Sequence, residues 1–491
     1  MTIDRRTFLG AAGLTAAIPV LSGLPAARAD QAPAEEPRRA AKNLVFMVAD
    51  GMSFGTLSLG DMVLQLRDGS RAHWVGLMNR AGTRRGLVET RSADGFVTDS
   101  AAASTAWGIG ELVDNGRVGM TPDGRFPTPI LIHAKQAGKA GGLVTTTRVT
   151  HATPAGFSCN VPTNRDDESR IAAQMLERRI DLMVGGGARF FPDSLLAKHP
   201  DVEVIRTRSQ FDAFAGGAVG TGPLLGLFAG SHVPFEVDRR TLSLPVPSLA
   251  EMSRAALARL ERAGGDAGFV LQIEGGRVDH AGHYNDAAGL IDDMIAFDAA
   301  VGAVIEWAAN RDDTLVIVTA DHATANPGLT EYGARGVKGL MKTLKFRHSF
   351  EWMEGKLASK FPLANPEPPE FGDGDMAHAT GIDINPADLR DIIEEATGIA
   401  LSKGETELLA RWKRGEAVDG FALAGARYGP LGAVMANHTF VAFLSPNHTS
   451  DPVEITAFGP GSELIAPWQQ INRVHAALVK ALDLPPAKPV A

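Results

Sequence analysis

Six short runs of mainly apolar residues recur along the chain, and each is soon followed by glycine or polar residues. The first run, residues 43–49, is almost continuously apolar and ends in Asp50-Gly51-Met52. Continuous apolar runs are typical of parallel strands that are buried on both faces of a sheet. The other predicted strands are residues 142–147, 181–184, 269–273, 314–319 and 454–458.

Helical periodicity appears between these runs. In residues 287–307 apolar side chains recur at helical spacing, which predicts an amphipathic helix. The side chains that form its apolar face are Leu290, Ile291, Met294, Phe297, Val301 and Val304. Strands that alternate with such helices favour an α/β fold with a mostly parallel sheet.

The stretch from about 327 to 431 breaks the alternation. It holds a proline-rich segment at 364–375 and a helical pattern at 386–397, where Asn385 would cap a helix whose first residue is Pro386. No buried-strand pattern stands out there. We interpret it as an insertion or cap within one α/β domain that spans residues 43–491.

The N-terminus has the pattern of a processing signal. Arg5 and Arg6 precede an apolar run that extends to about Leu24 and ends in Ala27-Arg28-Ala29. This order predicts a twin-arginine export signal over residues 1–29, followed by a flexible tether over residues 30–42. The expected location is periplasmic or secreted, with no stable membrane anchor after the signal is removed.

Composition narrows the class of protein. The 491 residues are 44% hydrophobic and 21% charged, enough to bury a large core. With 48 Lys and Arg against 57 Asp and Glu, the formal net charge is -9, which argues against nucleic acid as a dedicated partner. A single cysteine, Cys159, excludes an intramolecular disulfide and a cysteine-rich metal site.

Side chains with carboxylate, imidazole or hydroxyl groups follow several predicted strands. Any one of them, taken alone, is more often a capping or loop residue. Ligands of open α/β sheets bind beyond the carboxyl ends of the strands, so these side chains are expected to lie together. Carboxylates, imidazoles and hydroxyls suit Zn²⁺, Mg²⁺ or Mn²⁺, and a multi-metal hydrolase is the leading hypothesis. The candidates are Asp50, His151, Thr153, Glu274, Asp279, His280, His283, Asp321 and His322.

Ser100 is the candidate nucleophile. It begins an alanine-rich segment that favours a helix, so its hydroxyl would lie at a helix N-terminus, where an oxyanion or phosphate is stabilised. From this segment alone, the simpler interpretation is that Asp99 or Ser100 only caps the helix. A serine bound to a metal ion would, however, become a strong nucleophile.

The chain resembles the alkaline phosphatase family in six motifs that occur in order between residues 43 and 484. They are Ala49-Asp50-Gly51-Met52, Thr98-Asp99-Ser100-Ala101, His151-Ala152-Thr153-Pro154-Ala155, residues 274–283, Thr319-Ala320-Asp321-His322-Ala323, and a His-Thr pair before the Phe-Gly-Pro turn at 458–460. The resemblance implies an alkaline phosphatase-like three-layer sandwich, in which helices flank a mostly parallel central sheet that carries the insertion.

The resemblance also implies an activity and its cofactors. The expected enzyme is an alkaline phosphatase (EC 3.1.3.1) that hydrolyses small phosphate monoesters through a phosphoserine on Ser100, with two Zn²⁺ and one Mg²⁺, and a homodimer is possible. One zinc ion would be held by Asp279, His283 and His448, and the second by Asp50, Asp321, His322 and Ser100. Magnesium would be held by Asp50, Thr153 and Glu274, close to His151 and His280.

For the last zinc ligand and for the phosphate-binding arginine, the sequence offers a second candidate residue. Asn437-His438-Thr439 nearly duplicates Asn447-His448-Thr449, but in the family the ligand lies eleven positions before the Gly-Pro turn, which selects His448 over His438. Arg165 is the candidate for binding phosphate, because its guanidinium can contact two phosphate oxygens and Asp99 could orient it. Its spacing from Thr153 is one residue longer than expected, and Arg148 is the alternative.

Three other functions agree less well with the sequence than a phosphatase does. A sulfatase needs a Cys-x-Pro-x-Arg frame, which the sequence around Cys159 lacks, so Cys159 is expected to be a buried thiol. A phosphodiesterase of the same superfamily is the closest alternative, since the insertion could shape the substrate entrance or form a dimer contact. An exported phosphate- or metal-binding protein without turnover would have no reason to keep Ser100.

Overall fold

The computed structural model describes residues 40–217, 222–360, 384–416, 418 and 429–490. The predicted export signal at 1–29, most of the tether and the proline-rich segment at 364–375 lie outside the described residues. Ala41 and Lys42, which the sequence placed in the tether, are already part of the domain. Their amides donate to the carbonyl oxygens of Ala481 and Asp313, so the ordered domain begins slightly before the predicted boundary.

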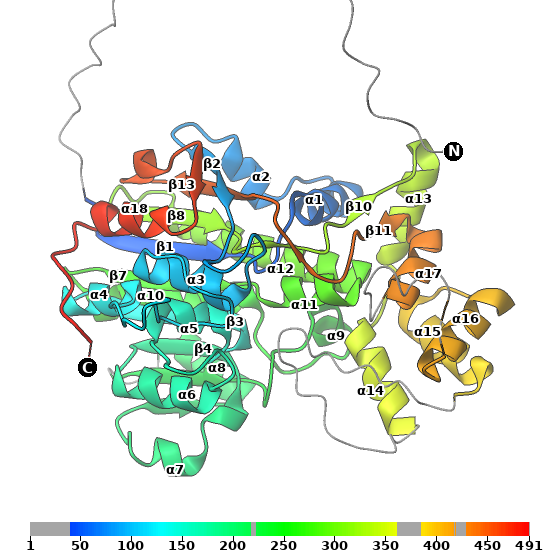
Figure 1. The fold of residues 1–491 in the computed structure, drawn as a ribbon, viewed down its shortest axis with the longest axis horizontal. Helices are drawn as coiled ribbons and strands as arrows, with labels where there is room; N and C mark the ends of the chain where they lie inside the picture. The colour runs from blue at the N-terminus through cyan, green and yellow to red at the C-terminus, as the bar shows by residue number, and fades with distance from the viewer. Residues whose placement is uncertain (1–39, 218–221, 361–383, 417, 419–428, 491) are drawn as a thin grey trace, which may run out of the picture. The chain divides into compact units, whose positions relative to one another are not determined.

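A ten-stranded sheet crosses the domain in the order β14-β2-β13-β8-β1-β7-β3-β4-β6-β5 (Figure 1). Only β13 runs antiparallel to its neighbours in this sheet, as the described pairings show. The strands are β1 Asn43–Val48, β2 Arg84–Glu89, β3 Ala140–Arg148, β4 Leu182–Gly186, β5 Glu203–Ile205, β6 Leu224–Leu227, β7 Phe269–Glu274, β8 Thr314–Thr319, β13 Val453–Phe458 and β14 Trp468–Gln470.

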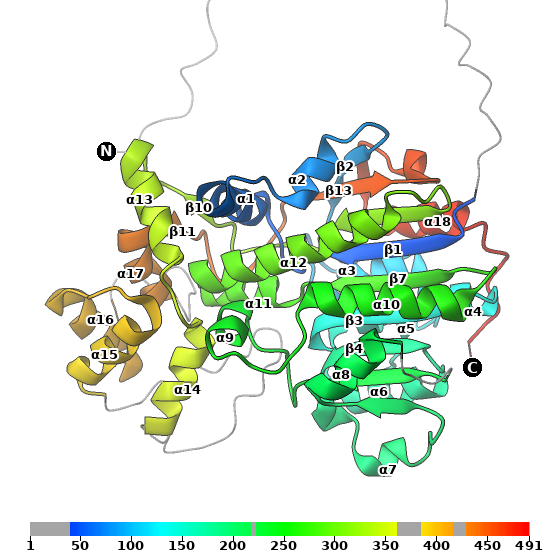
Figure 2. The same ribbon diagram turned by 180° about the vertical axis from the view of Figure 1, so that it is seen from behind.

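Helices cover both faces of the sheet, which confirms the predicted three-layer α/β sandwich. The face toward the viewer in Figure 1 carries α3 Ser100–Ile109, α4 Ile130–Gln136, α5 Ala152–Ser158, α6 Glu168–Glu177 and α18 Arg473–Ala481. The opposite face, seen in Figure 2, carries α1 Phe54–Asp68, α2 His73–Met78, α8 Arg208–Ala215, α10 Leu249–Gly264 and α12 Ala287–Ala308. Three further helices lie in the connections: α7 Asp193–Leu196, α9 Glu236–Thr241 and α11 Arg277–Tyr284.

All six predicted strands are present in the ten-stranded sheet, whereas four further strands of this sheet were not predicted. β5 and β14 have three residues each, too few for a visible pattern, and they lie at the two edges of the sheet. β2 contains polar and half-exposed positions, and β6 has four residues. A continuous apolar run therefore marks only the strands that are covered on both faces.

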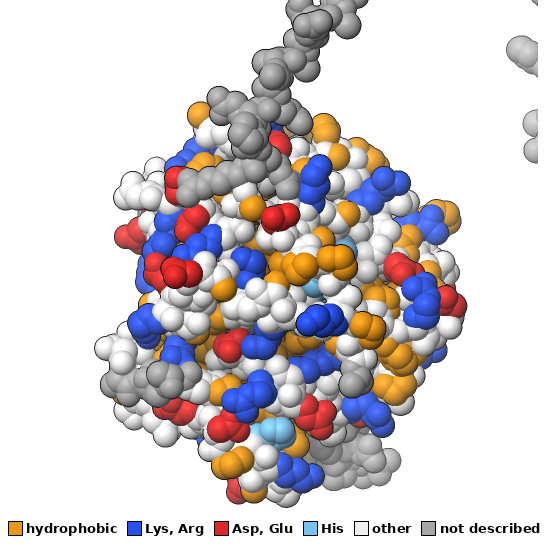
Figure 3. All heavy atoms as spheres, turned by 90° about the vertical axis from the view of Figure 1, so that its left-hand side faces the viewer, with side chains coloured by type: hydrophobic (Ala, Val, Ile, Leu, Met, Phe, Trp, Pro, Cys, Tyr) orange, Lys and Arg blue, Asp and Glu red, His pale blue; other side chains and the backbone are white. Residues whose placement is uncertain are grey.

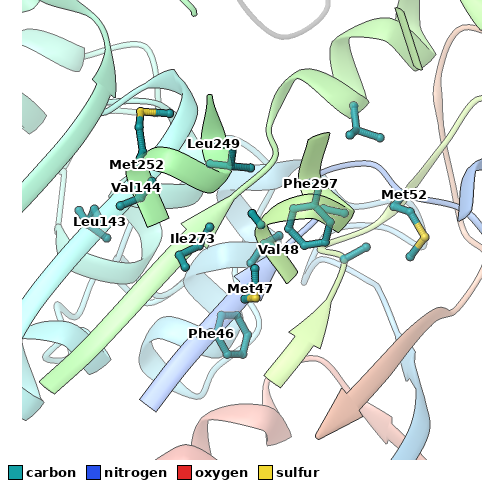
Figure 4. Packing of buried hydrophobic residues seen from close by; sticks show 14 of the residues in the cluster. Phe46, Met47, Val48, Met52, Leu143, Val144, Leu249, Met252, Ile273 and Phe297 are labelled. Carbon is teal, nitrogen blue, oxygen red and sulfur yellow. The ribbon is translucent and has the colours of Figure 1, made fainter. Parts of the chain in front are cut away.

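The central strands form the core together with the helices above and below them (Figure 4). Phe46 of β1 contacts Trp107 of α3 edge to face, with ring centroids 5.0 Å apart, and stacks on Phe157 of α5 at 5.6 Å. Burial of a side chain of this kind stabilises the fold by about 1.5–3 kcal/mol. The contacts hold α3 and α5 over β1, the strand that leads to Asp50.

Two glycines let α3 and α5 approach each other closely. A Cβ atom on Gly108 would lie 2.2 Å from the Gly156 carbonyl oxygen, and one on Gly156 would lie 2.6 Å from the Thr105 nitrogen. Real Cβ atoms do not make such contacts, so glycine is required at both positions. The hydroxyl of Ser104 also donates to the Thr153 carbonyl at 2.6 Å. The close packing fixes the start of α5, with Thr153, against the helix that Ser100 begins.

The insertion is mainly helical where the structure describes it, and the helix predicted at 386–397 is present. It contains α13 Gly333–Thr343, α14 Phe350–Lys360, α15 Pro386–Thr397 and α16 Lys403–Lys413, and α17 Gly429–Thr439 leads out of it. Asn385 caps α15 as expected, because its side chain accepts from the amide of Ala387. Two short sheets, β9 Ala323–Thr324 with β12 His448–Thr449 and β10 Gly328–Leu329 with β11 Val441–Ala442, lie where the chain enters and leaves the insertion.

The described surface and helices add two observations. On the face shown in Figure 3, Lys and Arg side chains lie among Asp and Glu side chains, not in one basic area. Within the described ranges, every helix is too short or too polar to span a bilayer.

Candidate metal centre

The candidate residues gather at the carboxyl ends of four neighbouring strands, β8, β1, β7 and β3. Val48 of β1 pairs with Thr319 of β8 and with Glu274 of β7, and Glu274 also pairs with Thr145 of β3. The residues that follow these strand ends therefore meet at one edge of the sheet. α11 starts three residues after Glu274 and adds Asp279 and His283.

Three groups of side chains bring their ligand atoms close enough to hold metal ions. In each group the atoms lie within 4.8 Å of one another. The groups are Asp279, His322 and His448; Asp50, Asp321 and His322; and Asp50, His151 and Glu274. Asp50 and His322 each belong to two groups, so the sites share ligands.

His283 completes the first group. Its Nε2 atom lies 3.0 Å from Nε2 of His448 and 3.2 Å from Oδ2 of Asp279. His448 Nε2 lies 3.5 Å from the other oxygen of Asp279. The geometry adds His322 to this group as well, although the sequence assigned it to the second zinc site, since its ring stacks on His448 with centroids 3.7 Å apart.

Ser100 reaches the second group. Its Oγ atom lies 3.2 Å from Nε2 of His322, which is 3.1 Å from Asp321 Oδ2 and 3.6 Å from Asp50 Oδ1. Asp99 caps α3, because its carboxylate accepts from the amide of Ala102 at 2.8 Å. The cap is therefore Asp99, and the hydroxyl of Ser100 is left to face the cluster.

Four carboxylates in the cluster each keep one oxygen that is fully buried and has no hydrogen-bond partner among the described residues. Burial of an ionised carboxylate without compensation is costly, and such groups are paired or bind metals. These oxygens converge with the imidazoles, so the donor set fits divalent cations. The atoms are Asp50 Oδ1, Glu274 Oε1, Asp279 Oδ2 and Asp321 Oδ2.

Titration behaviour agrees with this fit. Burial, followed by the charges of Asp321 and Asp279, raises the pKa of Asp50 well above its ordinary value. Burial also raises the pKa of Glu274. Burial and the neighbouring His322 lower the pKa of His448 to about 3, which leaves a neutral imidazole at neutral pH. Without a cation the Asp50 and Glu274 carboxylates resist ionisation, whereas the His448 imidazole keeps the lone pair that a metal requires.

The third group surrounds Glu274. One of its oxygens accepts from the hydroxyls of Thr145 at 2.5 Å and Thr147 at 3.2 Å, so β3 orients the carboxylate. Thr153 donates to Asp50 Oδ2 at 3.3 Å. Burial, and next the charge of Arg165, lowers the pKa of His151 to about 3, so this imidazole is also neutral.

Arg165 and Arg148 have different surroundings. Arg165 donates to Asp99 Oδ2 at 3.0 Å and lines a cavity of about 430 Å³ that also reaches His283 and His448. Arg148 is buried and holds Glu168 through Nε at 2.8 and 2.9 Å. A guanidinium committed to a buried carboxylate is poorly placed for a substrate, so the geometry favours Arg165 as the phosphate ligand.

His438, the competing histidine in Asn437-His438-Thr439, lies away from the cluster. His438 is on α17, and its Nε2 atom contacts Glu405 Oε1 of α16 at 3.0 Å. Cys159 is fully buried as a free thiol, as expected.

Two residues near the centre were not predicted. Thr324 donates to Asp279 Oδ1 at 2.6 Å and lies 3.2 Å from His322 Nδ1, so it supports two candidate ligands. The ring of His232 packs against His280 at 4.4 Å and His151 at 5.4 Å. His232 comes from the connection after β6 and matches no motif in the sequence, whereas Thr324 follows His322 closely enough to have been considered.

Comparisons with known proteins place the chain among phosphatases. The family model described as "Alkaline phosphatase" matches residues 41–484. The repressible alkaline phosphatase of Saccharomyces cerevisiae is 36% identical over 327 residues, which cover 58% of this chain and 55% of the yeast protein. The match thus spans little more than half of that relative.

A second curated relative and a solved structure are also similar to this chain. The streptomycin-6-phosphate phosphatase of Streptomyces griseus is 32% identical over 338 residues, which cover 58% of this chain and 74% of that protein. The crystal structure of Thermus thermophilus alkaline phosphatase superposes with a TM-score of 0.79 at 32% identity, and the match covers 92% of this chain and 93% of that one.

Proposed function

The chain belongs to the alkaline phosphatase family, and from that premise we propose that it hydrolyses phosphate monoesters through a phosphoserine on Ser100. One observation carries the proposal: Ser100 begins α3 with its Oγ atom 3.2 Å from His322 of the buried cluster, and the residues just before it, Thr98 and Asp99, line the cavity together with Arg165. A phosphate group in that cavity would meet a hydroxyl, a guanidinium and a helix N-terminus together.

The proposed cofactors are two Zn²⁺ and one Mg²⁺. When bound, such cations lower the pKa of hydroxyl and water ligands and stabilise charge on the transferring phosphoryl group. The first zinc ion would be held by Asp279, His283 and His448, and the second by Asp50, Asp321, His322 and Ser100. Asp50, Thr153 and Glu274 would hold magnesium, with His151 beside them. The grouping of buried carboxylates and imidazoles supports these assignments.

Arg165 would bind the phosphate group of the substrate. Its planar guanidinium can donate to two phosphate oxygens at once, which a lysine cannot reproduce. Asp99 accepts from Nη1, and the amide of Gly116 donates to the same Asp99 oxygen at 2.9 Å. Asp99 therefore holds Arg165 at the cavity while it caps the helix that carries Ser100.

The reaction would proceed in two displacements. Ser100 Oγ attacks phosphorus in line, so the Oγ–P bond forms as the bond to the leaving oxygen breaks. Ser100 gives up its proton in this step, and the leaving alcohol gains one. Water then attacks the phosphoserine, breaks the Oγ–P bond, releases phosphate and restores the serine hydroxyl.

We expect a general monoesterase of the alkaline phosphatase type (EC 3.1.3.1). The cavity that Arg165 lines also carries the short polar side chains Asn115, Asn164 and Asp166, which can accommodate different alcohols. The similarity to a streptomycin-6-phosphate phosphatase makes a single dedicated phosphate monoester the competing substrate.

Export by the twin-arginine route to the periplasm or the medium is part of the proposal. It rests on Arg5, Arg6 and the apolar run before Ala29 in the sequence. N-terminal sequencing of exported protein should find Asp30 first. An uncleaved N-terminus on exported protein would contradict the predicted signal.

The phosphoserine can be tested by trapping. Protein mixed with p-nitrophenyl phosphate, quenched in acid and digested should carry phosphate on the peptide that contains Ser100. Ser100→Ala should carry none and lose most turnover, while its zinc content stays near that of the wild type. Ser104→Ala, one turn further along α3, is the matched control and should still be labelled. Wild-type turnover in Ser100→Ala would refute the proposed mechanism.

A further inference from the structure

Asn285 joins two segments that are far apart in the sequence. It ends α11, two residues after His283, with φ 53° and ψ 32°, a left-handed conformation that asparagine tolerates better than most residues. Its side chain is buried, and Nδ2 donates to the carbonyl oxygens of Gly282 and Ser445, each at 3.0 Å. One amide group therefore ties the end of α11 to the segment 445–448.

This segment carries the other imidazole of the first group. His283 Nδ1 donates to the carbonyl oxygen of Pro446 at 2.5 Å, and His448 Nδ1 donates to that of Thr98 at 2.8 Å. A carbonyl can only accept, so both rings carry their proton on Nδ1 and present the lone pair of Nε2. These are the Nε2 atoms that lie 3.0 Å apart beside Asp279.

The separation of the two rings depends on how the segment is held against the helix. The hydrogen bond from His283 to Pro446 is a single attachment that runs through a ligand itself. The bond from Asn285 to Ser445 is a second attachment one residue away, and it does not involve a ligand. Two adjacent attachments prevent the segment from pivoting about either one.

The helix α17 supports Asn285 from the other side. A Cβ atom on Gly432 would lie 2.6 Å from the Cβ atom of Asn285, so the helix passes in direct contact with it. The chain enters the segment 445–448 from α17 through β11. The asparagine is therefore enclosed between α11, α17 and the segment that it holds.

We propose that Asn285 is a positioning residue for the metal centre, which sets the distance between the imidazoles of His283 and His448 by fastening the segment 445–448 to the end of α11. The inference rests on the zinc site of the proposed function. Partners that orient metal ligands in this way typically change metal affinity by about 10–100-fold when they are removed.

Zinc release tests the proposal without relying on activity. Asn285→Gly removes the side chain and keeps a residue that favours positive φ. Asn79→Gly is the matched control, because Asn79 also caps a helix C-terminus and donates to a carbonyl, that of Val75 at 2.8 Å, but is exposed. Zinc-loaded proteins would be mixed with a chelator and followed with a chromophoric zinc indicator.

We expect one zinc ion to leave Asn285→Gly about tenfold faster or more than it leaves the wild type and Asn79→Gly. The melting temperatures of the metal-free wild type and Asn285→Gly should agree within about 2 °C, and excess Zn²⁺ should restore kcat. If Asn285→Gly does not fold, Asn285→Asp replaces it, since a carboxylate of the same size cannot donate to the two carbonyls.

Two results would overturn the inference, and they are distinguishable. Equal release rates in the wild type and the variant would remove the positioning role and leave the proposed function intact. A wild type that binds no zinc would remove the proposed metal centre, and the inference with it.

Discussion

Asn437-His438-Thr439 and Asn447-His448-Thr449 nearly repeat each other, yet their imidazoles lie in different surroundings. His438 pairs with Glu405 at 3.0 Å between two helices, whereas His448 faces His283 and stacks on His322. The neighbours that the fold places around each imidazole therefore determine its role. Because the two sequence triplets are almost identical, His438 serves as a control for His448.

We therefore predict different effects for the same substitution. His448→Ala should lose about one zinc ion per chain and most activity, because it removes one of the three protein donors proposed for that ion. His438→Ala should retain zinc and activity and lose stability of order 1 kcal/mol, the net value of a partly exposed hydrogen bond. Metal analysis and thermal unfolding of both variants decide this. The assignment is wrong if His438→Ala loses zinc and His448→Ala keeps it.

Among single residues, the sequence predicted those members of the candidate site that follow a buried strand. Asp50, Glu274, Asp321 and His322 could be found in this way, since the strand pattern shows where the polar residue must lie. Thr324, two positions after His322, could have been considered in the same way, whereas His232 could not, because its proximity to the centre depends on the connection after β6. Asn285 matches no motif, and its role comes from a contact with a segment 160 positions away.

At the scale of elements, the close packing of α3 on α5 positions the nucleophile. Ser100 begins α3, His151 precedes α5 and Thr153 is on it, so the distance between the two helices sets the distance from Ser100 to the third group. The sequence predicted α3 from its alanines, but it did not predict that Gly108 and Gly156 meet.

Gly108→Ala should separate α3 from α5. The new Cβ atom would lie 2.2 Å from a backbone oxygen, so the helices must shift, with a loss of about 1–3 kcal/mol of stability and a fall in kcat. Gly76→Ala on α2 is the control, because no atom lies within 4 Å of its new Cβ and alanine favours a helix. Urea unfolding and kcat of both variants provide the comparison. Unchanged kcat in Gly108→Ala would show that this packing does not position Ser100.

The insertion also reaches the centre through an element contact. Glu351 of α14 accepts from Arg277 Nη2 at 2.5 Å, and Nη1 of the same buried arginine contacts His280 Nδ1 at 2.7 Å. The helix at 386–397 was predicted, but α14 and its contact with the centre were not, because an exposed-helix pattern does not show which side chain reaches inward.

At the scale of the whole molecule, the buried carboxylates make stability depend on cations and pH. The pKa values of Asp50 and Glu274 are raised in the folded metal-free protein, so the folded state holds protons that the unfolded chain releases from about pH 4 upward. The stability of the metal-free protein should therefore fall as pH rises through this range. Bound cations should remove this penalty.

We predict that chelation lowers the melting temperature more at pH 8 than at pH 5. Because both pKa values are raised, Asp50 and Glu274 of the metal-free protein hold more protons at pH 5 than at pH 8, and their mutual repulsion is weaker at pH 5. Thermal unfolding with and without chelator at both pH values measures the difference, and re-addition of zinc and magnesium should reverse it. A larger shift at pH 5 would have the wrong sign for this mechanism.

The central claim is that this member of the alkaline phosphatase family uses Ser100 and bound metals to hydrolyse phosphate monoesters. It is tested most directly by rates on p-nitrophenyl phosphate and bis-p-nitrophenyl phosphate, with metal analysis of the same preparation. We predict that the monoester reacts much faster and that the active protein contains both zinc and magnesium. A faster reaction with the diester, or full activity in protein without metal, would contradict the claim.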